Sequence, residues 1–348
     1  MPRGPRIHLR QSRKNWWTLS FKASRKGRRK WLQEFAHETV LFTETLMMLQ
    51  ARPGGRYVDC TLGGGGHTAG LLHKSGPDGT VLAIDQDPMA LAFVREQLVE
   101  FPERLVLVQG NFRNVREIAQ AHGFAGVDGV VFDLGVSSPQ FDLAQRGFSY
   151  RLAGPLDMRM DPQQSLTAAD LINTATEQEL IRIFFEYGEE RFARAIARVI
   201  VRTRTVHPIQ GTVELADLVK SAIPAAARRS GPHPARRIFQ ALRIAVNDEL
   251  GSLKAGLAGA FELLRPGGRL AVISFQSLED RIVKQAMAQW ARGCVCPPEF
   301  PICVCGKKPL GVGVTHRPVQ PSSVELEHNS RSRSAKLRVI ERLEESLV

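Results

Sequence analysis

Short runs of apolar residues recur through the first part of the chain, and segments with helical spacing separate them. The runs lie at 57–58, 81–84, 105–108 and 130–132, and helical spacing follows the first two at 68–72 and near 89–99. A short apolar run bounded by turn-forming residues is typical of a buried strand. Strands that alternate with helices pair in parallel through right-handed crossovers. The pattern therefore predicts an α/β fold with four parallel strands here.

This alternation stops near Asp142 and is replaced by other patterns. Residues 145–165 are rich in Gly, Pro, Arg and Asp, which predicts a long irregular loop. Residues 167–230 show helical patterns only, with Thr167 and Thr176 as candidate helix caps. Helices are then expected at 238–250 and 255–264, before a strand at 270–273.

We therefore predict one doubly wound, Rossmann-like sheet that a block of helices interrupts. The sheet domain is expected to be discontinuous and to comprise 34–142 and 238–342. The helical insertion domain is expected at 143–237, and a basic disordered tail at 1–33.

The net charge of +12 is concentrated in that tail. The first 30 residues contain 11 Lys/Arg and no Asp/Glu, so the rest holds 36 basic and 35 acidic residues. The tail could attract RNA phosphates, but a solvated arm, a transit peptide or a wrongly assigned start codon explains it as well. Five cysteines and no apolar run near the ~20 residues of a membrane span favour a reducing, cytoplasmic location without a membrane partner.

Polar residues and glycines follow the predicted strands. Asp59 and four glycines at 63–66 come after the first strand, Asp85 after the second and Phe112 after the third. Ligands of open parallel sheets bind beyond the carboxyl ends of the strands, where an acidic residue can hold ribose hydroxyls. Phe112 can flank an adenine ring. We favour a nucleotide-cofactor site over the alternative, a helix-entry turn with Asp59 as a cap.

The glycine pattern decides among cofactors. A phosphate-binding loop requires Lys after its glycines, and none follows here. The dinucleotide fingerprint fails because Thr68 occupies its third glycine position. An adenosine without pyrophosphate remains, which suits S-adenosyl-L-methionine, with Asp59 near its cationic end.

The fourth strand ends in 133–141, DLGVSSPQF. Amino methyltransferases place a polar-Pro-x-aromatic turn at this point. Ser138 and the carbonyls around Pro139 are candidate acceptors for an exocyclic amine, and Phe141 is a candidate stacking partner for the base. An ordinary Ser-Pro turn is the alternative for this segment by itself.

These and further motifs resemble the RsmH (MraW) family, the cytosine-N4 methyltransferases of small-subunit ribosomal RNA. The resemblance runs from about His37 to Val339. Its further motifs are HETVL with Glu44 at 37–44, RGFS at 146–149, GPLDMRM at 154–160, FQALRI at 239–244, VNDEL at 246–250, SLEDR at 277–281 and RSRSAKLR at 331–338.

The resemblance implies a Rossmann-like S-adenosylmethionine-dependent methyltransferase with an inserted all-helical domain. It implies a target cytidine in the decoding region of small-subunit (16S) rRNA, and cofactor contacts at Gly65, Gly66, His67, Asp85, Phe112, Asp133 and Gln140. Two positions depart from the family pattern: Gln276 stands where His is usual, and Ser330 replaces a Pro. Gln cannot titrate near neutral pH, so a general-base role at position 276 is not expected here.

Two other groups are candidates for function. Cys294, Cys296, Cys303 and Cys305 form C-x-C…C-x-C, which can bind zinc, although reduced cysteines in a proline-rich loop are the interpretation we favour. Four arginines near the end of the insertion are candidate RNA contacts, namely Arg228, Arg229, Arg236 and Arg237.

The leading hypothesis is thus methyl transfer to a cytosine amine in rRNA, within an assembled or nearly assembled small subunit. A non-catalytic RNA-binding assembly factor and a DNA amino methyltransferase are the alternatives. The near-neutral body argues against DNA, and the intact glycine loop with Asp85 argues against loss of catalysis.

Overall fold

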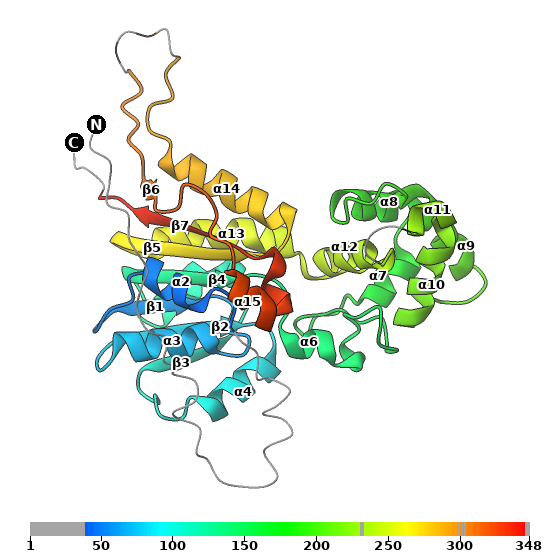
Figure 1. The fold of residues 1–348 in the computed structure, drawn as a ribbon, viewed down its shortest axis with the longest axis horizontal. Coiled ribbons are helices and arrows are strands. Elements are labelled where there is room, and N and C mark those ends of the chain that lie inside the picture. The colour runs from blue at the N-terminus through cyan, green and yellow to red at the C-terminus, as the bar shows by residue number, and fades with distance from the viewer. Residues whose placement is uncertain (1–38, 230–232, 298–299, 301, 303, 345–348) are drawn as a thin grey trace. The chain divides into compact units, whose positions relative to one another are not determined.

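A seven-stranded sheet organises the chain in a computed structural model, which describes residues 39–229, 233–297, 300, 302 and 304–344 (Figure 1). The basic tail lies outside the described residues. The strands are β1 (Arg56–Asp59), β2 (Thr80–Asp85), β3 (Leu105–Gln109), β4 (Val127–Asp133), β5 (Leu264–Ser274), β6 (Gly311–Gly313) and β7 (Lys336–Arg342). All five strands expected from the apolar runs are confirmed.

The strand order is β3-β2-β1-β4-β5-β7-β6, with β1 to β5 parallel and β7 antiparallel to both its neighbours. The chain leaves β1 toward β2 and β3 on one side and then returns to β4 on the other. This reversal creates a crevice at the carboxyl ends of β1 and β4, where ligands of such sheets bind.

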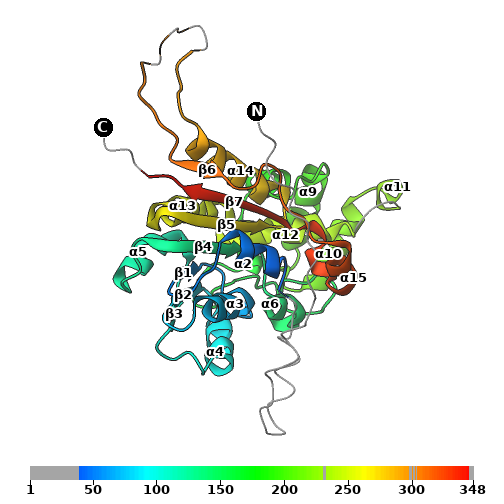
Figure 2. The same cartoon turned by 60° about the vertical axis from the view of Figure 1, so that its left-hand side comes forward.

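Helices cover both faces of the sheet, because alternate strand residues point to opposite sides. Phe132 and Val272 belong to the hydrophobic cluster beneath α5 (Val115–Ala121), α13 (Glu249–Leu263) and α14 (Ser277–Ala291). Val131 and Ala271 belong to the cluster beneath α2 (Phe42–Met48) and α3 (Gly66–Ser75). A smaller cluster lies beneath α4 (Pro88–Gln97), and Figure 2 shows these layers from a second side.

Between β4 and α13 the described residues contain helices and irregular segments but none of the strands of the sheet. The helices are α6 (Ser138–Asp142), η3 (Ala144–Arg146), α7 (Ala168–Thr174), α8 (Glu177–Glu186), α9 (Ala193–Arg204), α10 (Thr212–Ala222), α11 (Ala225–Arg228) and α12 (Ala235–Asn247). Residues 148–246 contribute a hydrophobic cluster of their own. The boundaries of the insertion as a separate domain stay a prediction.

The two expected caps are confirmed. The Asp170 amide donates to Thr167 Oγ1 at 3.1 Å, and the Glu179 amide donates to Thr176 Oγ1 at 3.2 Å. The carboxylates of Asp170 and Glu179 in turn accept hydrogen bonds from the backbone amides of the two cap residues. Each pair of bonds forms a capping box.

The expected bounds of the two helices before β5 are wrong. The sequence suggested 238–250 and 255–264, whereas α12 ends at Asn247 and α13 begins at Glu249. Asp248, with φ 45° and ψ 46°, is the single left-handed residue that ends one helix and starts the next. Asp tolerates this conformation better than most residues, but apolar spacing carries no sign of such a break.

Short helices complete the structure: η2 (Phe112–Asn114), α15 (Ser323–His328) and η4 (Ser330–Ser334). None of the helices in the described ranges is both long enough and apolar enough to cross a bilayer.

Candidate cofactor and target site

A small cavity, here called the strand-tip cavity, opens at the predicted crevice. Residues that follow β1, β3 and β4 line it, and α13 and α14 supply the opposite wall. Its lining includes Thr61, Phe112, Gly135, Glu249, Ser252 and Glu279. Phe112 also packs edge-on against Phe132 of β4, with ring centroids 5.4 Å apart. The cavity therefore lies where the sequence predicted a cofactor, with Phe112 in its wall.

The glycine loop after β1 turns tightly into α3. Gly65 has φ +79° and caps the helix, and a Cβ there would lie 2.8 Å from Val94. A Cβ on Gly66 would overlap the Thr39 hydroxyl. Side chains are thus excluded by backbone conformation at one position and by close packing at the other.

Asp85, at the end of β2, connects this loop to its own strand. Its Oδ2 accepts from the Gly63 amide and its Oδ1 from the Asp87 amide, both at 2.9 Å. Burial raises the pKa of Asp85 to about 6, against the opposing effect of these hydrogen bonds. A carboxylate oxygen accepts more than one hydrogen bond, so Asp85 can still accept from ribose hydroxyls.

Asp133 and His67 present buried polar atoms that lack hydrogen-bond partners in the described part of the chain. These atoms are Asp133 Oδ1 and both ring nitrogens of His67, and His67 Nε2 lies 3.7 Å from Asp133 Oδ2, which is too far for a hydrogen bond. Burial raises the pKa of Asp133 to about 8, and burial lowers the pKa of His67 to about 4. Unsatisfied buried polar atoms are costly in a folded protein, and a bound polar ligand removes that cost.

Four carboxyl groups lie near this point, and we call Asp59, Asp85, Asp133 and Glu279 the carboxylate cluster. Asp59 and Glu279 are buried, whereas Asp85 and Asp133 are partly buried. Burial raises the pKa of Glu279 to about 7 and also raises that of Asp59. The negative charge of Asp59 contributes to the raised pKa values of both Asp85 and Asp133. A cation bound here would relieve this repulsion, so the cluster fits a ligand with a sulfonium and an ammonium group.

Within the carboxylate cluster, the Asp59 side chain accepts hydrogen bonds from the loop after β1 and from α3. Its Oδ1 accepts from the Thr61 amide at 3.0 Å and its Oδ2 from the Thr68 hydroxyl at 2.7 Å. Only 1% of Asp59 is exposed. This geometry therefore favours a structural role for Asp59 at the entry to the helix over direct contact with a ligand.

A buried ionic network that sequence reasoning missed lies beside the cluster. Arg146 Nη1 donates to Asp87 Oδ2 at 2.5 Å, and the other guanidinium nitrogen donates to the carbonyls of Arg159 and Met160. Gln140 Nε2 also donates to Asp87 Oδ2, at 3.0 Å. The network ties the end of β2 to α6 and to the irregular loop. The only sign of this network in the sequence was Arg146 of the RGFS motif, for which the sequence suggested no partner.

The turn after β4 forms α6, which Ser138 begins. The Ser138 side chain lies outside the described part of the structure, and Pro139 is buried. Gln140 is 4% exposed and accepts from the Ser137 amide at 3.1 Å, so both ends of its amide contact protein. Phe141 is 39% exposed. The contact expected between Gln140 and a cofactor, like the role of Ser138, stays a prediction.

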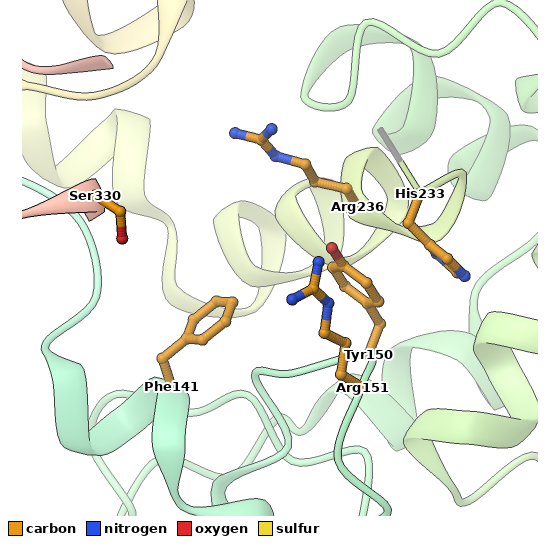
Figure 3. Close-up of a pocket in the computed structure, with 6 residues that line it drawn as sticks. All are labelled: Phe141, Tyr150, Arg151, His233, Arg236 and Ser330. Carbon is orange, nitrogen blue, oxygen red and sulfur yellow. The ribbon is translucent and has the colours of Figure 1, made fainter. Parts of the chain in front are cut away.

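Phe141 lines a second, larger pocket of about 450 Å³, here called the aromatic pocket. Its other lining residues are Tyr150, Arg151, His233, Arg236 and Ser330. Figure 3 shows Phe141 and Ser330 on one side and the other four residues opposite, with the Phe141 ring directed toward them. The Tyr150 ring stacks on His233, with centroids 4.8 Å apart and a 13° angle between planes. Flat rings and two guanidinium groups thus share one solvent-open space.

The four arginines predicted to bind RNA have different surroundings. Arg236 lines the aromatic pocket, whereas Arg237 donates to the Glu189 carbonyl and lies 3.8 Å from a Glu190 oxygen. Arg228 Nε is buried and has no hydrogen-bond partner among the residues that the structure describes, and Arg229 is exposed. RNA contact stays a prediction for all four, and Arg236 has the most suitable position.

Gln276, the departure from the family pattern, is the N-cap residue of α14. Its Oε1 is buried and has no hydrogen-bond partner among the described residues. It stands three residues before Glu279, whose carboxylate accepts from the Gln276 amide at 3.1 Å. Gln276 therefore lies next to the part of α14 that lines the strand-tip cavity through Glu279.

Comparisons with known proteins agree on one family. A sequence model described as the MraW methylase family matches residues 34–343. A protein of Symbiobacterium thermophilum named ribosomal RNA small subunit methyltransferase H is 55% identical over 310 residues, covering 89% of this chain and 98% of that protein. A protein of the same name from Brevibacillus brevis is 55% identical over 309 residues, with the same two coverages. One from Geobacter sulfurreducens is 53% identical over 309 residues, covering 89% of this chain and 99% of that protein.

Proposed function

The chain belongs to the MraW methylase family, and on that premise we propose that it methylates the N4 amine of a cytidine in the decoding region of small-subunit (16S) rRNA. S-adenosyl-L-methionine is the methyl donor. The observation that carries the proposal is the pairing of two unlike sites across α6. The carboxylate cluster suits a cationic donor, and the aromatic pocket suits a nucleotide of an anionic chain.

Residues of the strand tips would hold the donor. Asp85 can accept from the ribose hydroxyls, and Phe112 can lie against the adenine. The unsatisfied Asp133 Oδ1 and the ring nitrogens of His67 can bind the amino-acid end. Gly65 and Gly66 have no side chains, so the backbone at these positions can come close to the donor. When bound, the donor supplies an electrophilic methyl group on a positively charged sulfur.

The aromatic pocket would receive the target nucleoside. Tyr150 and Phe141 offer ring faces on which a base can stack, and Arg151 and Arg236 offer cations for its phosphates. The base must leave its stack to reach the donor, which RNA loops allow more readily than duplexes. Arg228, Arg229 and Arg237 are proposed to extend this basic rim.

The turn at Ser138 and Pro139 would position the amine. The cytosine N4 lone pair is delocalised into the ring, so the amine is a weak nucleophile. Acceptors at the Ser138 hydroxyl and the neighbouring carbonyls would take its hydrogens and hold its nitrogen in line with the methyl group. Such positioning supplies up to ~7–11 kcal/mol of a reaction barrier in favourable systems.

One labelling experiment tests this function. The protein is incubated with labelled S-adenosyl-L-methionine and with undermethylated small subunits, naked rRNA or DNA, and the label is located by mass spectrometry. We expect label at N4 of one cytidine, with assembled or nearly assembled subunits as the best substrate. Label only on DNA, or RNA binding without any label, would contradict the proposal. Cytoplasmic action stays a prediction.

A further inference from the structure

The described residues between α14 and β6 form no hydrophobic core. None of the described residues from 294 to 310 is buried, and Val295, Ile302 and Val304 are 44%, 74% and 73% exposed. In Figures 1 and 2 the orange part of the chain leaves the sheet beyond α14 and returns to β6. Its base is closed by the Leu310 amide, which donates to the Trp290 carbonyl at 2.8 Å. Long segments without a core or secondary structure of their own are uncommon in compact domains, and a link between their side chains would hold such a segment together.

Three cysteines of this segment meet at one point. The Sγ atoms of Cys294, Cys296 and Cys305 all lie within 4.8 Å of one another. Cys294 and Cys305 are 11 positions apart, and their sulfurs are 3.7 Å apart. Tetrahedral zinc with Zn–S bonds of about 2.3 Å places its sulfur ligands about 3.8 Å from each other. The Cys294–Cys305 distance of 3.7 Å matches this value, and the limit of 4.8 Å for the other sulfur pairs is compatible with ligands around one zinc ion.

Backbone amides already donate to these sulfurs. The Val295 amide donates to Cys305, the Cys296 amide to Cys294 and the Val304 amide to Cys296, each at 3.4 Å. Each of the three sulfurs therefore accepts at least one N–H···S bond. Amide donors favour the thiolate over the thiol, and such outer contacts orient the ligands of metal sites.

We propose that Cys294, Cys296 and Cys305 are ligands of a structural zinc site. The ligands are soft thiolates, a set that selects zinc over hard cations such as Mg²⁺ or Ca²⁺. The C-x-C…C-x-C pattern makes Cys303 the expected fourth ligand, although its placement lies outside the described residues. Bound zinc would replace the missing core of this segment.

The site has a structural and not a catalytic role. Glu279, in the first turn of α14, lines the strand-tip cavity, whereas the cysteines follow the other end of the helix. Fifteen residues of helix separate these ends, which is about 21 Å at 1.5 Å per residue. The zinc would therefore be remote from the reacting atoms, and this inference does not depend on the proposed function.

Metal content of the full-length protein tests the site. After purification with a reductant, zinc loading and dialysis, mass spectrometry of the metal should give about one zinc per chain. Cobalt loading should give the intense visible and sulfur-to-cobalt charge-transfer bands of a tetrahedral thiolate site. The variants Cys294→Ser and Cys296→Ser should each lower the zinc content at least roughly tenfold after dialysis, because they remove a thiolate ligand. Circular dichroism checks that they remain folded.

Cys60→Ala is the matched control, because Cys60 is the chain's one cysteine outside the segment and is buried after β1. It should keep the zinc. The inference is overturned if the wild type retains no metal, if the serine variants retain it, or if a Cys294–Cys305 disulfide persists with reductant present. Loss of zinc in Cys303→Ser would support four thiolates, and retention would overturn that ligand set. Methylation measured on the same variants is a separate readout, so failure of the proposed function is distinguishable.

Discussion

The carboxyl groups beside the strand-tip cavity are largely enclosed by protein, whereas the arginines of the aromatic pocket are open to solvent. Asp85 is partly buried and accepts from two backbone amides, while Arg236 and Arg151 are exposed and line a pocket of about 450 Å³. Under the proposed function, the first region would hold the small donor, and the second would offer charge and ring faces to the large RNA.

The two regions also carry opposite charges. The carboxylate cluster suits a cation, and the arginines of the aromatic pocket suit a polyanion. Neighbouring residues of α6 contact both surroundings, since Gln140 donates to Asp87 and Phe141 lines the aromatic pocket. Under the proposed function, a cationic donor and an anionic acceptor would therefore bind in separate regions of opposite charge. Four measurements test this division.

The largest effect is expected for Asp85→Ala. Loss of the charged ribose acceptor should weaken S-adenosyl-L-methionine binding about 100-fold or more, since hydrogen bonds to charged groups contribute about 1.5–3 kcal/mol each. Calorimetry measures the affinity, and thermal melting checks the fold. Asp78→Ala, at an exposed aspartate before β2, is the control and should bind normally. Unchanged affinity in Asp85→Ala would refute the ribose assignment.

Charge reversal at the aromatic pocket should act on RNA and not on the donor. Arg236→Glu should raise KM for the small subunit by roughly 30-fold and reduce the salt dependence of binding, because one phosphate contact becomes repulsive. Cofactor affinity should stay unchanged. Arg95→Glu, at an exposed position on α4, carries the same charge change as a control. Equal effects of the two variants would show that net charge, and not this pocket, attracts RNA.

Ser138→Ala should slow turnover about tenfold while keeping cofactor affinity, as expected for one lost hydrogen bond near the reacting amine. Single-turnover kinetics with saturating subunits measures the chemical step. Ser221→Ala, which removes an exposed hydroxyl on α10, is the control. Wild-type turnover in Ser138→Ala would remove this side chain from the mechanism.

The smallest effect concerns pH. Asp133, with a pKa of about 8, and Glu279, with about 7, hold protons in the folded protein that they lose in the unfolded chain. The folded state thus binds more protons, and without cofactor its stability should fall as pH rises from about 5 to 8, by roughly 5 °C in Tm. Binding of the cationic donor at pH 7 should release roughly one proton, measurable by calorimetry in buffers of different ionisation enthalpy. No release would mean that the donor's cation lies away from the cluster.

The sequence predicted helices and strands better than it predicted which distant residues contact each other. Buried strands appear as apolar runs because both faces of a parallel sheet are covered, and the glycines at 65 and 66 appear because close packing excludes side chains there. Asp85 and Phe112 were found because strand ends share one edge of the sheet. Each of these signals is local, so a single stretch of chain reveals it.

The remaining features depend on contacts between distant residues. Arg146 and Asp87 are 59 positions apart, and Asn247 accepts from the Met160 amide across 87 positions. Spacing shows which face of an element is buried but does not identify what lies opposite. The sulfur cluster is an intermediate case: its pattern was visible, but only the distances favour zinc over reduced cysteines.

Asp248 connects the helical insertion to the wall of the strand-tip cavity. It alone separates α12, which packs within the insertion, from α13, whose residues Glu249 and Ser252 line the strand-tip cavity. Asn247, just before it, donates to the Met158 carbonyl and accepts from the Met160 amide. Because a single residue joins the two helices, a change in the direction of α12 would also move the α13 residues that line the cavity.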